Sequence, residues 1–143
     1  MRTLECVYEF PYLGDMLNDA GGVEKAVAAR VRAAWMKFRE LGGILCTRGA
    51  SLRVKGVVYK ACVRSVLTNG AETWAMKAGV FQRLRATERR MICRVTLKDM
   101  VESTMIASRV EVNDLEEHLR QKRLRWFGHI VRRDEEVEIK ESV

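Results

Sequence analysis

The chain has 143 residues, of which 48% are hydrophobic and 31% charged, with one proline and a formal net charge of +7. This length suits one domain, and the apolar content is sufficient for a packed core, which argues against wholesale disorder. No apolar run approaches the ~18 residues of a membrane span, and the N-terminus lacks a signal-peptide pattern, so we expect an intracellular protein, in the nucleus or the cytoplasm, without a membrane partner.

The first two elements differ in their pattern. Residues 6–18 mix apolar and polar side chains around Pro11 and Gly14, which predicts short strands and a tight turn. From Val23 to about Leu41, apolar residues recur at helical spacing, which predicts a helix. The pair of glycines that follows, 42–43, is expected to end this helix.

A second helix is predicted to begin after Ser51, whose hydroxyl can accept a free backbone N–H of the first turn. Its expected end is Asn69–Gly70, where glycine can adopt the left-handed conformation. The apolar stripe expected on this helix consists of Val54, Val58, Ala61, Cys62, Ser65 and Val66.

A third helix is predicted from about Val80 to Val95. Its expected buried side chains are Phe81, Leu84, Met91, Ile92 and Val95. At about 100° per residue, Arg83, Arg90 and Arg94 fall on the opposite face. These arginines either contact phosphate or form an ordinary solvated face.

The last predicted helix opens at Asp114, which has capping-box spacing to Glu117, and runs to about Arg132. Two apolar stripes lie on nearly opposite sides of it. One consists of Leu115, Leu119, Trp126 and Ile130, and the other of Leu124, Phe127 and Val131. A helix that is apolar on two faces needs two partners.

The charge is unevenly distributed along the chain. Residues 134–143 hold five acids and one lysine, a net charge of −4, which leaves +11 on the other 133 residues. A basic body with an acidic tail favours a polyanionic partner, most commonly nucleic acid. A soluble basic domain without such a partner is the alternative.

The sequence offers no recognisable catalytic constellation. The five aspartates include no adjacent pair that could hold metal ions, and no Gly-rich phosphate loop or Ser–His or Cys–His nucleophile signature is present. The four cysteines form no C-x-x-C pair, and neither His118 nor His129 completes a zinc-ligand spacing. We therefore expect no catalytic residue, no metal site and no cofactor in this chain, and four reduced, largely buried thiols. His129, beside Gly128, is expected to be a packed, hydrogen-bonded residue.

Three motifs, in this order, carry a family resemblance: Phe10-Pro11-Tyr12-Leu13-Gly14, residues 65–74 (SVLTNGAETW) and residues 123–130 (RLRWFGHI). Together they resemble the C-terminal part of the reverse transcriptases of non-LTR retrotransposons, over roughly residues 8–136. The resemblance implies a mainly α fold, a thumb-like helical bundle with a short N-terminal β-hairpin. It divides the chain into the end of the palm with a primer-grip-like hairpin (1–20), a thumb-like bundle (21–98), C-terminal helices (99–133) and an acidic tail, expected to be disordered (134–143).

The resemblance also implies a function. The chain would be a truncated reverse transcriptase (RNA-directed DNA polymerase) fragment without the catalytic Asp pair, and so no enzyme by itself, although the parent enzyme would use Mg²⁺. Tyr12, Leu13 and Gly14 take the place of the primer grip. One departure is a gap of about one helical turn after Arg94, which puts in doubt how the third helix packs on the last one.

A thumb tracks the backbone of an RNA–DNA or DNA duplex without reading its sequence. The implied phosphate contacts are Arg48, Arg53 and Lys55, at a loop and a helix start, and Arg83, Arg90 and Arg94 on the third helix. Trp35, Trp74 and Trp126 could stack on bases, but burial is the expected role for each.

Other interpretations stay open. One is a stand-alone basic helical module that binds nucleic acid, and another is a protein-interaction fragment that uses the Leu124, Phe127 and Val131 stripe. The missing palm of a parent enzyme is a further expected partner.

Overall fold

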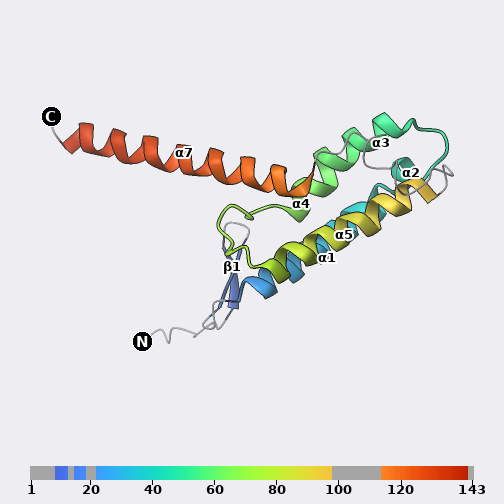
Figure 1. The fold of residues 1–143 in the computed structure, drawn as a ribbon, viewed down its shortest axis with the longest axis horizontal. Coiled ribbons are helices and arrows are strands. Elements are labelled where there is room, and N and C mark those ends of the chain that lie inside the picture. The colour runs from blue at the N-terminus through green and yellow to red at the C-terminus, as the bar shows by residue number, and fades with distance from the viewer. Residues whose placement is uncertain (1–8, 13–14, 19–21, 98–113, 142–143) are drawn as a thin grey trace, which may run out of the picture.

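Helices dominate the chain, as expected for a mainly α protein. The structure, a computed structural model, describes the backbone of residues 9–12, 15–18, 22–97 and 114–141, and the side chains of residues 22–95 and 114–133. The helices in these ranges are α1 (Val23–Glu40), α2 (Gly42–Leu45), α3 (Leu52–Val58), the π-helix η1 (Tyr59–Arg64), α4 (Ser65–Leu67), α5 (Ala78–Leu97) and α7 (Leu115–Glu141) (Figure 1).

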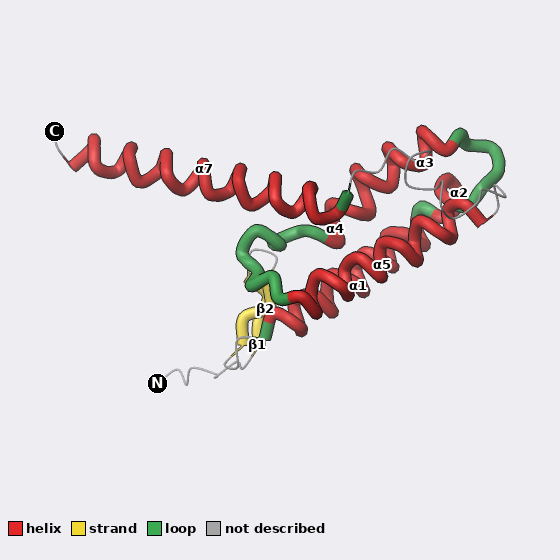
Figure 2. Tube along the Cα trace, viewed as in Figure 1, coloured by secondary structure: helices red, strands yellow, loops and turns green. Residues whose placement is uncertain are grey.

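Two short strands precede the helices (Figure 2). β1 (Glu9–Tyr12) and β2 (Asp15–Asn18) pair antiparallel, with Glu9 opposite Asn18 and Tyr12 opposite Asp15. The turn predicted between them, residues 13–14, lies outside the described residues. Of the primer-grip-like motif, only the backbone of Tyr12 can therefore be placed, at the end of β1.

The prediction of α1 is confirmed, but its end was predicted for the wrong reason. An acidic residue, Glu24, lies in the first turn, and Lys37 and Arg39 lie in the last, which suits the helix dipole. The two glycines after Leu41 do not stop helical structure, since they begin the short helix α2. The backbone makes a turn at Leu41 and resumes hydrogen bonding, because the amide of Leu45 donates to the carbonyl of Leu41.

The second predicted helix is an unbroken run of α3, η1 and α4. Its predicted start is confirmed, because the Ser51 hydroxyl accepts a hydrogen bond from the amide of Val54 at 3.4 Å. Its predicted end is confirmed as well, since Gly70 has a φ of 80°. The predicted apolar stripe is wrong by about one position, and Val54 is exposed.

The buried positions of this segment recur every four residues, at Lys55, Tyr59, Val63 and Leu67. The offset of one position from the predicted stripe is already present at Lys55, in α3, before the π-helix begins at Tyr59. The predicted stripe therefore had the right spacing but the wrong phase. Its members Val58, Cys62 and Val66 lie partly buried beside the core face, whose first position is a lysine that hydrophobicity alone assigns to the surface.

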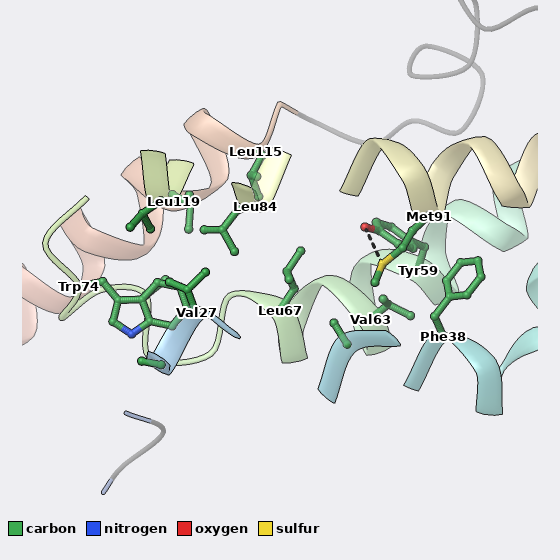
Figure 3. Close-up of a cluster of buried hydrophobic side chains, with 14 of the residues drawn as sticks. Val27, Phe38, Tyr59, Val63, Leu67, Trp74, Leu84, Met91, Leu115 and Leu119 are labelled. Atoms are coloured by element: carbon green, nitrogen blue, oxygen red, sulfur yellow. Dashed lines mark hydrogen bonds between the residues drawn. The ribbon is translucent and has the colours of Figure 1, made fainter. Parts of the chain in front are cut away.

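Three helical segments enclose the core. Helices α1 and α5 lie side by side and run in the same direction, and the α3–η1–α4 segment returns in the opposite direction (Figure 1). Figure 3 shows side chains from all three segments meeting, among them Phe38, Tyr59, Val63 and Met91. Leu84, Met91 and Val95 of α5 are buried as predicted, while Phe81 and Ile92 are partly buried at its edge.

Among the described residues, helix α7 packs on this body at its beginning. Leu115 and Leu119 enter the core beside Leu84, as Figure 3 shows. The rest of α7 extends away from the body (Figure 1). The helix continues to Glu141, so the prediction that it ends near Arg132 before a disordered tail is wrong for residues 134–141. No glycine or proline follows Gly128, and glutamate and lysine favour helix, so the sequence holds no stop signal there.

Candidate nucleic-acid interface

A basic hollow lies between α1 and α5. Its volume is about 530 Å³, and it is lined by Trp35 of α1 and by Arg89, Arg90, Cys93 and Arg94 of α5. All three arginines are exposed, whereas Trp35 is half-buried. Because α1 and α5 run in the same direction, their C-terminal parts lie together and bring Trp35 beside these arginines.

Trp35 and Arg94 are in direct contact. The guanidinium carbon of Arg94 lies 5.3 Å from the centre of the Trp35 ring, within the range of a cation–π interaction. The Phe38 and Trp35 rings form a T-shaped pair, with 5.6 Å between centroids and an interplanar angle of 74°. One aromatic side chain thus joins the apolar core on one side and a positive charge on the other.

The predicted arginines of α5 do not all come together. Arg90 and Arg94 share the hollow, but Arg83 lines a separate hollow of about 320 Å³ near the start of α5, with Glu24, Val27 and Lys77 among its neighbours. Sequence reasoning missed Arg89. It follows the buried Glu88 in the sequence, and only the packing of α5 on α1 shows that it faces the same hollow as Arg90.

The second predicted cluster is wrong in one of its members. Arg48 and Arg53 are exposed, but Lys55 is completely buried, so it cannot contact a phosphate from the surface. The physical reason is its position, four residues before Tyr59 on the face that η1 turns toward the core. Arg48 and Arg53 stay candidates for a backbone contact.

A buried ion pair anchors the α3–η1–α4 segment to α5. The Nε atom of Arg64 donates to Oε1 of Glu88 at 2.7 Å, and both side chains are buried. The Tyr59 hydroxyl donates to the same oxygen at 3.3 Å. Burial, reinforced by the Glu88 charge, raises the pKa of the Tyr59 phenol far above its ordinary value, so this hydroxyl stays protonated. These groups hold the fold and face no hollow described above.

Polar contacts fix the first turns of α7 to the turn that follows α4. Lys122 Nζ donates to the carbonyl oxygen of Thr68 at 2.6 Å and lies 3.3 Å from the carboxylate of Glu72. Arg123 donates from Nη2 to the carbonyl oxygen of Trp74, also at 2.6 Å. The hydrogen bond from Arg123 thus joins the 65–74 and 123–130 motifs of the sequence, and Lys122 adds a second one from the residue just before the later motif.

His118 belongs to the same junction. Its Nε2 lies 3.3 Å from the Thr68 hydroxyl, which already donates its proton to the carbonyl of Arg64, so Nε2 must be the donor. Burial lowers the pKa of His118 below its usual value, and the charges of Arg64, Lys122 and Arg125 lower it further. The neutral imidazole is the form that this site favours.

Beyond this junction, the predicted orientation of α7 is wrong. Trp126 was expected to face the bundle, yet 41% of its surface is exposed, compared with 63% for Phe127. Leu124 and Val131 are exposed too, as predicted for their stripe. His129 is exposed and not packed. Both stripes are open here because the later part of α7 extends away from the body (Figure 1).

The tryptophans therefore have three different environments. Trp74 is buried, as predicted, while Trp35 is half-buried and Trp126 exposed, contrary to the expectation for each. Cys46, Cys62 and Cys93 are free thiols that are half-buried, less covered than predicted, and Cys6 lies outside the described residues.

The described part of the chain holds no cluster of metal-ligating side chains. Within the same residues, no helix is both long enough and apolar enough to cross a membrane. The groups that the hollow offers are three guanidinium groups, an aromatic ring and the Cys93 thiol. The guanidinium groups and the ring can bind a phosphate or a flat ring.

Comparison with known proteins gives one informative similarity. In an alignment 139 residues long, which covers 91% of the chain, it is 28% identical to a Caenorhabditis elegans protein described as uncharacterized and transposon-derived. The chain spans about half of that protein's length, 49%. No family model matches the chain, and no solved structure matches it. The similarity supports a transposon-derived origin.

Proposed function

We propose that this chain is the thumb region of a non-LTR retrotransposon reverse transcriptase and contacts the backbone of a template–primer duplex. The three sequence motifs, the mainly α fold and the transposon-derived relative support this origin. The chain by itself is not a polymerase, since its sequence lacks the paired aspartates that hold two metal ions. Mg²⁺ and the palm belong to the parent enzyme, which acts in the nucleus or cytoplasm.

The observation that carries the duplex contact is the convergence of Arg89, Arg90 and Arg94 at one exposed hollow. Guanidinium groups form paired hydrogen bonds with phosphate oxygens, and three of them on one surface suit a polyphosphate strand. Such contacts position a protein on a duplex without reading bases, so we expect affinity without sequence preference.

The test measures how affinity for a DNA duplex and an RNA–DNA duplex changes with salt. Each phosphate contact contributes about 0.9 to the slope of log K against log salt on B-DNA. The double variant Arg89→Gln/Arg90→Gln is expected to bind more weakly to both duplexes and to flatten the slope on DNA by about 1.8.

The charge-matched control is Arg132→Gln/Arg133→Gln, at exposed positions on the part of α7 that leaves the body. This variant changes the net charge by the same amount and is expected to keep most of the slope. Equal flattening in both variants would mean that only the overall charge attracts nucleic acid, as in a basic module without a defined site. No binding in low salt would refute the proposed contact altogether.

One observation favours a second function, a protein-interaction fragment. Leu124, Phe127 and Val131 are large apolar side chains that α7 exposes together. In this alternative they bind a protein, such as the remainder of a parent enzyme, since the chain spans only half of its relative. The two functions use different surfaces and are compatible with each other.

A further inference from the structure

We propose that the hollow between α1 and α5 receives an unpaired nucleobase next to the duplex, which stacks against the Trp35–Arg94 pair while Arg89 and Arg90 hold the adjoining phosphates. The inference rests on the proposed duplex contact and names the part of the nucleic acid that this hollow takes. It goes beyond a backbone contact because it assigns a role to an aromatic ring.

Trp35 is the first argument for a base. A site for phosphate alone needs only cations and amides, whereas this one is built against an indole ring. Trp35 is half-buried and packs against Phe38 in a T-shaped contact, so its ring is held in one orientation. A ring fixed in this way loses little conformational entropy when a ligand stacks on it.

Arg94 is the second argument. Its guanidinium group already lies over the Trp35 ring, at 5.3 Å from the centroid. Bases stack on guanidinium planes as well as on aromatic rings, so a base can extend this pair by one layer within the hollow. The volume of about 530 Å³ lies within the ordinary range of small-molecule sites.

The base must be unpaired, because a base within a duplex is covered on both faces by its neighbours. Only an unstacked base, at the end of a duplex or in a single strand, offers a free face to a side chain. The hollow adjoins exposed arginines of the same helix, α5, so a strand could pass from the phosphate contacts directly into it. The preferred ligand is therefore a duplex with a single-stranded end.

The experiment compares three fluorescently labelled DNA ligands by anisotropy at fixed salt: a blunt duplex, the same duplex with a short overhang, and the same overhang made of abasic residues. The two overhangs carry identical phosphates, so the ratio of their affinities isolates the bases. For the unaltered chain we expect the intact overhang to bind roughly 5- to 140-fold more tightly than the abasic one, the range that stacking of one base gives.

Trp35→Leu and Arg94→Gln are each expected to bring this ratio toward one. The second variant changes an exposed side chain, so it tests the stack even if replacing Trp35 disturbs folding, which circular dichroism would reveal. The matched controls are Trp126→Leu, at an exposed tryptophan of α7, and Arg85→Gln, at an exposed arginine of α5 outside the hollow. Both controls are expected to keep the ratio.

A ratio near one in the unaltered chain, with salt-dependent binding of the blunt duplex intact, would overturn this inference and leave the proposed function standing. A ratio that survives both Trp35→Leu and Arg94→Gln would overturn the hollow as the site of the base. Preference for the intact overhang with no affinity for the blunt duplex would support the base site and refute the duplex contact instead.

Discussion

At the scale of single residues, the least predictable feature is the buried charge on the second helical segment. Arg64 and Lys55 are both buried, although lysine and arginine side chains are usually exposed. The sequence gives no sign of this, because the partner of Arg64 is Glu88, 24 residues away on another helix. The local sequence pattern alone places such cations on the surface. For this reason Lys55 was wrongly predicted to contact phosphate.

The Arg64–Glu88 pair leads to a prediction about stability. Glu88→Ala should destabilise the fold by about 3–5 kcal/mol, because it leaves the buried guanidinium of Arg64 without its carboxylate. Urea unfolding followed by circular dichroism measures the change. Glu117→Ala removes an exposed carboxylate and is expected to alter stability by less than about 0.5 kcal/mol.

A double variant separates the net contribution of the pair from the cost of breaking it. Arg64→Met/Glu88→Met replaces both charges by apolar side chains and should be less destabilising than Glu88→Ala. A loss of under about 1 kcal/mol for Glu88→Ala would contradict the view that this pair holds α5 to the π-helix.

At the scale of elements, the sequence predicted helices well and their faces less well. Helix α1 and the caps at Ser51 and Gly70 follow from local hydrogen bonding and backbone preference, which a short stretch of sequence encodes. The buried face of the α3–η1–α4 segment could not be predicted, since it contains Lys55 and Arg64, whose charge assigns them to the surface. Two arginines of the candidate hollow, Arg90 and Arg94, could be predicted to lie together because they share a helix. Their proximity to Trp35 could not, because Trp35 belongs to another helix.

The start of α7 was predicted from a capping box, and half of that motif forms. The Asp114 carboxylate accepts from the amide of Glu116 at 3.3 Å. The Glu117 carboxylate accepts a hydrogen bond from the Gln121 side chain at 3.0 Å. What holds this end of α7 is its tertiary contact with Thr68, Glu72 and Trp74, which no local motif predicts.

His118 makes this junction sensitive to pH. Its pKa is lowered in the folded chain, first by burial and then by Arg64, Lys122 and Arg125, from the ordinary 6.5. Above pH 6.5 the imidazole is neutral in both states and contributes no pH dependence. As the pH falls below 6.5, the unfolded chain binds the proton more readily, so stability is lost toward the lower folded pKa.

We therefore expect the stability of the unaltered chain to fall more between pH 8 and pH 5 than that of His118→Gln. Both proteins have the same carboxylates, so the stability that these groups lose in acid is the same in both and cancels in the comparison. His129→Gln, at an exposed histidine of the same helix, should behave like the unaltered chain. Urea midpoints at several pH values measure the effect, and equal pH profiles for all three proteins would contradict it.

At the scale of the whole molecule, the chain has a packed body and a helix that leaves it. The body is a bundle with a basic hollow between α1 and α5. Helix α7 extends away from this bundle (Figure 1), and several of its large apolar side chains are exposed. The sequence predicted two partners for α7, and the structure provides one of them, the body itself, at Leu115 and Leu119. The second could not be found within the described residues, since Trp126 and Phe127 are exposed there.

Exposed apolar side chains on a projecting helix should make the isolated chain self-associate. The double variant Trp126→Ser/Phe127→Ser is expected to reduce this association, measured by light scattering across a range of concentrations. It should change the free energy of unfolding little, within about 1 kcal/mol, because both side chains lie outside the core. Leu119→Ala, by contrast, should cost about 2–4 kcal/mol, since Leu119 is buried where α7 meets the body.

The two measurements together decide what the projecting part of α7 does. Reduced association with preserved stability would mean that these side chains form a surface for a partner. In solution, a second copy of the chain would bind to this surface in place of that partner. Destabilisation by Trp126→Ser/Phe127→Ser as large as that by Leu119→Ala, with association unchanged, would mean that α7 folds back on the body. In that case the apolar residues of α7 would complete a single core, and the chain would need no second partner.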